Sequence, residues 1–176
     1  MIRIERLDAG AACRHQSALA EVLHDCVAGG ASISFMWPFS REQAAHYWKS
    51  IVAAVREDRA CLLGAFDDDR LGGTVQLWLD GPCNQRHRGD VRKLLVHRAM
   101  RRRGMARRLM QALEAEARSR QLSLLTLDTA TGSDGERLYR AMDWQSVGVI
   151  PRYALWPDGR FCDTTVFYKE LAVTAA

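Results

Sequence analysis

The sequence predicts a single domain of mixed α/β class that spans residues 1–176. Two observations carry this prediction. Short apolar segments typical of strands alternate with amphipathic helical patterns along the whole chain. A strand-like segment at 91–96 also runs through a glycine-bearing turn into a long helical pattern. A chain of this length can bury one full core, and no linker, internal repeat or low-complexity segment divides it.

The first half of the chain is expected to begin with a strand and two helices. The expected elements are, in order, a strand at 2–7, a helix at 11–27 that ends at Gly29 and Gly30, a helix that Ser40 caps and that runs to residue 55, and strands at 60–66 and 71–79. An acidic turn joins the last two strands, and a polar loop follows them.

The second half is expected to alternate strands and helices. The expected elements are a central strand at 91–96, a helix from Met105 onwards, a strand at 122–127, a short helix that Ser133 begins and that runs to residue 142, and closing strands at 144–150 and 162–169. The strand at 122–127 is almost entirely apolar, which is expected when both faces of a strand are covered.

Composition narrows the class of protein. Apolar residues make up 48% of the chain, which excludes disorder, and no apolar run is long enough to cross a bilayer. The N-terminus lacks the apolar middle of a signal peptide. Five scattered cysteines without a C-x-x-C pair predict free thiols in a reducing cytoplasm. The five histidines lack metal-ligand spacing, so no metal is expected.

The turn at 101–106 is the most informative segment. A glycine turn that opens into a helix leaves backbone N–H groups without partners, and the helix dipole adds positive charge there. These features suit a phosphate or pyrophosphate, which Gly104 lets approach closely. Arginines surround the turn: Arg98, Arg101, Arg102, Arg103, Arg107 and Arg108. Such a patch is also compatible with a solvated helix face or with nucleic-acid binding, but the glycine turn favours a cradle for a phosphate-rich cofactor.

The pattern Arg101-x-x-Gly104-x-Ala106, between a strand and a helix, resembles the acetyl-CoA pyrophosphate loop of the GNAT superfamily of N-acetyltransferases. The segment at 138–144 resembles that family's tyrosine-bearing helix, turn and aromatic strand start. The chain is more similar still to the tabtoxin-resistance acetyltransferases, in the segments 23–24, 29–32, 35–36, 91–96, 127–129, 132–133 and 157–160. It departs from the family at Asp143, where glycine is usual, and at Arg98, where proline is common.

The resemblance implies a GNAT-type fold, with a central, mostly antiparallel sheet that helices flank and that splays apart at the cofactor site. It implies acetyl-CoA as co-substrate, with pantetheine paired to the strand before the turn and a backbone N–H near Leu95 or Val96 as oxyanion donor. The implied cofactor-binding residues are Leu94, Leu95, Val96, Arg101, Arg102, Arg103, Gly104, Met105, Ala106 and Arg107.

Three residues are candidates for proton transfer. Tyr139 is the candidate general acid for the departing thiolate, because a phenol can deliver a proton to a thiolate; the alternative is a buried packing tyrosine. Asp90, expected just before the central strand, is the candidate general base; the alternative is a turn aspartate. Asp128, expected at a strand end, either shares the base role, binds the substrate ammonium or caps the following loop.

The apolar and aromatic loop at 31–39 is expected to wall the acceptor pocket, as in the family. Ser32, Ser34 and Trp37 are the candidate substrate contacts together with Asp128, whereas Phe35 and Met36 are expected in the core. Trp156 and Arg152, near the last hairpin, are expected to close the other side of the pocket.

The expected function is acetyl transfer to the amine of a small molecule by direct attack in a ternary complex, with a tabtoxin-like amino acid toxin or antibiotic as the acceptor. We expect a monomer or homodimer that binds neither nucleic acid nor membrane. Two alternatives stay open: acetylation of a protein or peptide amine, and a module without catalysis that senses acetyl-CoA or binds RNA.

Overall fold

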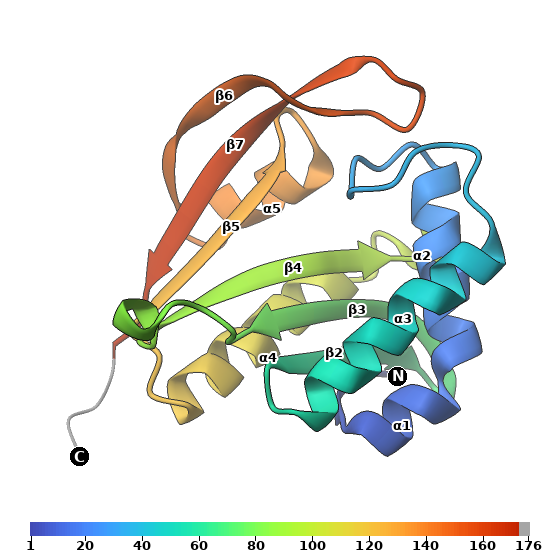
Figure 1. The fold of residues 1–176 in the computed structure, drawn as a ribbon, viewed down its shortest axis with the longest axis horizontal. Coiled ribbons are helices and arrows are strands. Elements are labelled where there is room, and N and C mark those ends of the chain that lie inside the picture. The colour runs from blue at the N-terminus through green and yellow to red at the C-terminus, as the bar shows by residue number, and fades with distance from the viewer. Residues whose placement is uncertain (173–176) are drawn as a thin grey trace.

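The computed structural model describes residues 1–172 and contains one seven-stranded sheet in the order β1-β2-β3-β4-β5-β7-β6 (Figure 1). Only the β4–β5 pair is parallel. The mostly antiparallel mixed α/β architecture expected from the sequence is therefore confirmed. The strands are β1 (Ile2–Leu7), β2 (Ala60–Asp67), β3 (Arg70–Trp78), β4 (Arg88–Val96), β5 (Leu124–Ala130), β6 (Gln145–Leu155) and β7 (Phe161–Glu170).

Helices cover both faces of the sheet. They are α1 (Ala9–Arg14), α2 (Gln16–Ala28), α3 (Arg41–Arg56), α4 (Met105–Ser119) and α5 (Asp134–Arg140), with the 3₁₀ turns η1 (Cys83–Gln85) and η2 (Arg98–Met100). One core forms where α1, α2 and α3 pack on the sheet, around the buried Trp48 and Phe66. The second core lies under α4 on the opposite face (Figure 1), around Leu109 and Phe167.

The helix expected at 11–27 is in fact two helices. Asp8 accepts a hydrogen bond from the N–H of Ala11, so α1 begins at Ala9, earlier than the apolar pattern suggests. The chain then leaves helical geometry at His15, whose ring packs edge-on against Phe66 at 5.1 Å between centroids. The helix α3 follows the prediction, because Ser40 and Gln43 form a reciprocal capping box.

The two central strands diverge, and this divergence positions the candidate site. β4 and β5 pair only between Arg88–Asp90 and Leu124–Thr126, although both strands continue well beyond that point. Figure 1 shows them separating from a shared end beside η1, so that β5, β6, β7 and α5 tilt away from the rest of the sheet. The splay implied by the family resemblance is therefore present.

Two expected strand boundaries were wrong in ways that matter for the site. β4 begins at Arg88, so Asp90 lies within the central strand and not before it. β5 runs from Leu124 to Ala130, so Asp128 also lies within a strand and not at its end. The apolar runs used for the prediction left out the ends of both strands. At those ends buried side chains alternate with less buried, polar ones such as Asp90 and Asp128.

Candidate active site

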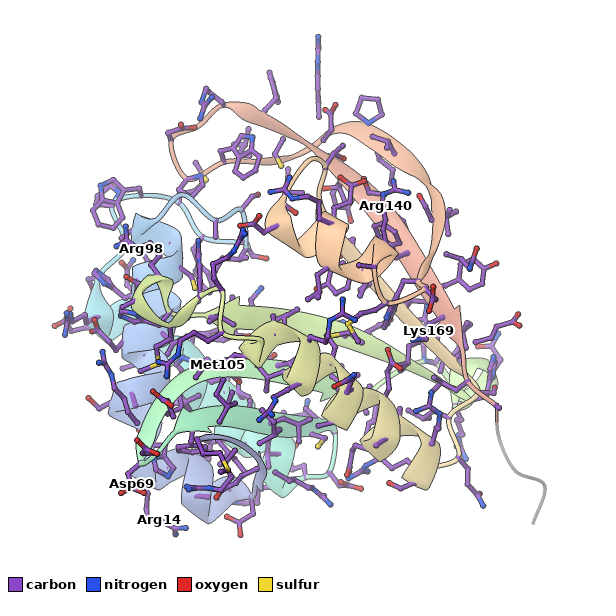
Figure 2. All side chains as sticks on the ribbon, turned by 180° about the vertical axis from the view of Figure 1, so that it is seen from behind. Arg14, Asp69, Arg98, Met105, Arg140 and Lys169 are labelled. Atoms are coloured by element: carbon purple, nitrogen blue, oxygen red, sulfur yellow. The ribbon has the colours of Figure 1, made fainter. Side chains whose placement is uncertain are left out.

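The first part of the site is the beginning of α4, which Met105 marks in Figure 2. Gly104 occupies the N-cap position with φ +79°, and no side chain caps the helix. A Cβ at Gly104 would meet no heavy atom within 4 Å, so the space beside the N-cap is open. Uncapped amides, the helix dipole and this open approach fit a pyrophosphate.

The arginines around the turn mostly bond to the protein itself. Arg98 donates from its Nε to Asp25 at 2.9 Å, and Arg103 forms an ion pair of 2.8 Å with Asp67. Backbone carbonyls accept the others: Val96 for Arg101, Ala141 for Arg107 and Ile2 for Arg108. Within residues 1–172, only Arg102 of this group has neither a hydrogen bond nor an ion pair. These side chains thus fix the turn, whereas the backbone amides at the start of α4 have no side-chain cap.

Asp25, on α2, anchors the chain just before the turn. Its carboxylate accepts hydrogen bonds from the backbone N–H of Arg98 at 2.7 Å and from that residue's guanidinium. Burial alone would raise the pKa of Asp25, but the two hydrogen bonds outweigh it and hold the pKa below its usual value. Figure 2 shows Arg98 beside the end of α2, which ties η2 to the helical layer.

Tyr139 is the second part of the site. Its side chain is only 6% exposed, and its ring packs against Trp144 and Phe167 at 5.8 and 5.9 Å between centroids. Burial, and then the negative charge of Asp128, raise the pKa of Tyr139 far above that of a free phenol. The hydroxyl has no hydrogen-bond partner in the part of the chain that the structure describes. Tyr139 is therefore a protonated donor close to Asp128.

The two candidate carboxylates have different surroundings. Asp90 lies at the paired end of β4, where it accepts a hydrogen bond from Thr126 and stands 3.6 Å from the guanidiniums of both Arg88 and Arg92. Asp128 is exposed on the diverging part of β5 and has no ion pair within residues 1–172. Of the two carboxylates, Asp128 is the one whose charge raises the pKa of Tyr139, whereas Asp90 is engaged by its neighbours.

The loop before α3 docks on the β6–β7 hairpin. Ser32 donates from its Oγ to the carbonyl of Leu155 at 2.8 Å, and the N–H of Trp37 donates to Pro157 at 3.0 Å. The expectation that Met36 is core was wrong, because it is 45% exposed and Phe39 is buried in its place. Met36 and Trp37 instead stand on the rim of the site.

Two open pockets adjoin this loop. One of about 410 Å³ is lined by Trp37, Trp156 and the turn between β6 and β7, but not by Arg152. The other, of about 580 Å³, is lined by Ser34 together with Phe35 and Tyr47. Ser32 lines neither pocket. Of the three predicted loop contacts, Trp37 and Ser34 face open space, and Ser32 holds the loop to the hairpin.

Sequence reasoning missed Lys93. It lies in a bulge of β4, where two residues, Lys93 and Leu94, stand opposite one residue of β3, and its φ is +50°. Its Nζ donates to Ser34 at 3.2 Å. Burial, and then the nearby Arg92, lower its pKa to about 8, although Asp128 acts in the opposite direction. The sequence carries no signal for this, because a bulge in a basic strand has no residue pattern of its own.

Three further features of the described residues concern membrane spans, metal sites and cysteines. Within the described residues, no helix is long and apolar enough to cross a membrane. The same part of the chain contains no group of three or more His, Cys, Asp or Glu side chains placed to hold a metal ion. Every cysteine of the chain is a free thiol. The splayed sheet and the uncapped helix define an α/β protein built to take a phosphate-bearing cofactor.

The chain belongs to the acetyltransferase (GNAT) family, whose family model matches residues 30–144. It is thus an N-acetyltransferase of the class that uses acetyl-CoA, and the open amides at the start of α4 fit the pyrophosphate of that cofactor. The matched residues include the central strand, the turn and Tyr139.

Solved structures share the fold over nearly the whole chain. An N-acetyltransferase from Staphylococcus aureus is 12% identical, with a TM-score of 0.80 and coverage of 98% of this chain and 99% of that one. The protein yncA of Salmonella typhimurium, solved with its cofactor acetyl-CoA, is 17% identical, with a TM-score of 0.79 and coverage of 100% and 97%. A ribosomal-protein-alanine N-acetyltransferase from Brucella melitensis is 21% identical, with a TM-score of 0.78 and coverage of 96% and 99%.

Proposed function

We propose that this enzyme transfers the acetyl group of acetyl-CoA to the amine of a small molecule, by direct attack within a ternary complex. The observation that carries the proposal is the splay between β4 and β5. The strand on one side of the splay leads to the uncapped amides of α4, and the strand on the other side carries Asp128 and leads to the helix of Tyr139. Pantetheine entering between the strands would bring its thioester between these groups.

In the proposed reaction, Asp128 binds the substrate ammonium and takes one proton from it. The free amine nitrogen then attacks the thioester carbon, and a backbone N–H near Leu95 or Val96 stabilises the developing oxyanion. The C–S bond breaks as the intermediate collapses, the nitrogen releases its second proton to solvent, and the thiolate receives a proton from Tyr139. Solvent restores that proton and removes the one held by Asp128.

The two proton transfers assist each other. The negative charge of Asp128 is one of the causes that raise the pKa of Tyr139. When Asp128 takes the proton of the amine, that charge disappears, so Tyr139 becomes a stronger acid just before the thiolate leaves. This coupling supports Asp128 as the base in preference to Asp90, whose carboxylate Thr126 and two arginines already engage.

For the acceptor, we propose an amino compound of the tabtoxin type, with detoxification as the role, in a monomeric or homodimeric enzyme. The loop that carries Ser34 and Trp37 supports a small acceptor, because both residues line open pockets of limited volume. The free thiols support a reducing compartment such as the cytoplasm. The Brucella neighbour, named for acetylating a ribosomal-protein alanine, keeps a peptide amine as the second candidate.

A thiol-release assay with acetyl-CoA tests the proposal against amino acids, polyamines, aminoglycosides and N-terminal peptides. We expect turnover above the rate of acetyl-CoA hydrolysis with at least one small amine. Faster turnover of peptides than of every small amine would favour the second candidate. Binding of acetyl-CoA without turnover of any amine would contradict the proposal and favour a sensing module.

A further inference from the structure

Lys93 is a cation without an anionic partner at the edge of the acceptor side. Its side chain leaves the β4 bulge towards α3 and the 31–39 loop, where Nζ donates to the hydroxyl of Ser34 at 3.2 Å. No carboxylate within residues 1–172 lies at ion-pair distance from Nζ. Partial burial of an ammonium without a counter-ion is costly, so the site favours a ligand that supplies negative charge.

Aromatic rings hold the ammonium in place. Nζ lies 5.6 Å from the ring centroid of Phe35 and 5.9 Å from that of Tyr47, both within cation–π range. The hydroxyl of Tyr47 is fixed in turn by hydrogen bonding with Gln76 at 3.1 Å. Ser34, Phe35 and Tyr47, the residues around the ammonium, also line the open pocket of about 580 Å³, whereas Lys93 itself does not line it.

The strand on the other side of the splay carries an opposite charge, that of Asp128. Asp128, on β5, is close enough to raise the pKa of Lys93 as well as that of Tyr139. Yet Asp128 is exposed and does not pair with Lys93. The site therefore holds a separated positive and negative group, one on each diverging strand.

We propose that Lys93 binds a carboxylate of the acceptor while Asp128 binds its ammonium, so that the enzyme selects zwitterionic amino acids over simple amines. This inference rests on the proposed function and names the substrate class of the same site. Lys93 is a specificity-determining residue in this scheme and takes no part in the proton transfers. A simple amine would meet the uncompensated charge of Lys93, whereas an amino acid would neutralise it.

The test compares each amino acid with its decarboxylated amine in the thiol-release assay. Suitable pairs are phenylalanine with phenethylamine, histidine with histamine, methionine with 3-(methylthio)propylamine and lysine with cadaverine. For wild type we expect kcat/KM at least tenfold higher for the amino acid of a pair that is turned over. Because the amine pKa differs within a pair, the decisive readout is how this ratio changes when Lys93 is replaced.

Lys93→Met and Lys93→Gln remove the charge at similar length, Lys93→Arg keeps it, and Lys49→Gln is the matched control on the exposed side of α3. In both neutral variants the KM of the amino acid should rise at least tenfold, with the KM of the amine unchanged or lower. Lys93→Arg should recover much of the discrimination. If the neutral variants still turn over amines and the ratio of kcat/KM between amino acid and decarboxylated amine is unchanged, the Lys93 assignment alone is overturned. Failure of every amine to react would overturn the proposed function and, with it, this assignment.

Discussion

The two ends of the site are built in different ways. The cofactor end is local: the end of β4, the turn and the start of α4 lie within residues 96–107, and their neighbouring arginines fix them in place. The acceptor end is assembled from distant segments, because the 31–39 loop, the β4 bulge, β5 and the β6–β7 hairpin all contribute. A site built from one local segment can be predicted from the sequence, whereas a site built from distant segments depends on tertiary contacts.

Substitutions at the two ends should therefore change different properties of the enzyme. A change at the turn should alter acetyl-CoA binding and leave acceptor selectivity intact. A change at Asp128 or Tyr139 should alter turnover with cofactor binding preserved. A variant that moved both properties equally would show that the division is wrong.

The largest effect is expected at Tyr139. Tyr139→Phe keeps the ring that packs against Trp144 and Phe167 but removes the hydroxyl. A positioned proton donor typically contributes about 10²–10⁴ in rate, so kcat should fall within that range while thermal stability stays near that of wild type. Steady-state kinetics and a thermal melt measure both. Retention of nearly full kcat across pH would make Tyr139 a packing residue.

The next largest effect should distinguish the two carboxylates. Asp128→Asn should lower kcat/KM by about 10² or more at neutral pH, with partial recovery at high pH, where free amine is abundant. Asp90→Asn serves as the comparison and should have a smaller effect, because Thr126 and two arginines engage Asp90. A pH–rate profile with one good amine measures both variants. If the acidic limb moves in Asp90→Asn and not in Asp128→Asn, the base is Asp90.

A smaller effect is expected on stability at Asp25. The folded-state pKa of Asp25 lies below its unfolded value, so its contribution is full above the unfolded pKa, about 3.9, and is lost as pH falls through the folded pKa. Asp25→Asn should cost about 1.5–3 kcal/mol at pH 7, the range for hydrogen bonds to a charged group. Denaturant unfolding at pH 7 and at pH 3 measures it. An equal difference at both pH values would contradict the assignment.

The smallest effect is expected at Arg102, the one arginine of the turn without a bonding partner within residues 1–172. Arg102→Ala should weaken acetyl-CoA binding about two- to fivefold, and the loss should shrink at high salt, because the side chain is exposed. Titrations at low and high ionic strength test this, with Arg118→Ala near the far end of α4 as control. A loss of affinity of 10² or more would show that side chains, and not the backbone, hold the cofactor.

Sequence reasoning predicted the fold, which the structure confirms, and it predicted a cofactor end, because the signals for both are local. The capping residue Ser40, the turn glycine Gly104 and the amphipathic pattern of α4 each determine a conformation over a few residues. The family resemblance supplied two further predictions, the splay of the sheet and Tyr139 as the candidate general acid. Reasoning failed where a contact far along the chain decides the outcome: Met36 is exposed because its loop docks on the hairpin, and Lys93 depends on a bulge.

Arginine density along the chain did not reveal which arginines bond to the protein itself. The sequence places six arginines around the turn, which favours a cluster of side chains contacting phosphate. The structure shows five of them bonded to carboxylates or carbonyls of the protein, including Asp25, Asp67 and Ala141. Spacing along the chain cannot reveal these partners, because they belong to α2, β2 and the end of α5.

Calorimetric titration of acetyl-CoA into wild type and Gly104→Val tests most directly that the backbone at the start of α4 holds the cofactor. The new side chain would stand in the open space beside the N-cap of α4, at a φ of +79°. A folded Gly104→Val variant should bind at least tenfold more weakly, a loss of about 1.4 kcal/mol or more. Its affinity should not be restored by lower salt. Unchanged affinity in a variant whose circular dichroism and melting match wild type would contradict the central claim.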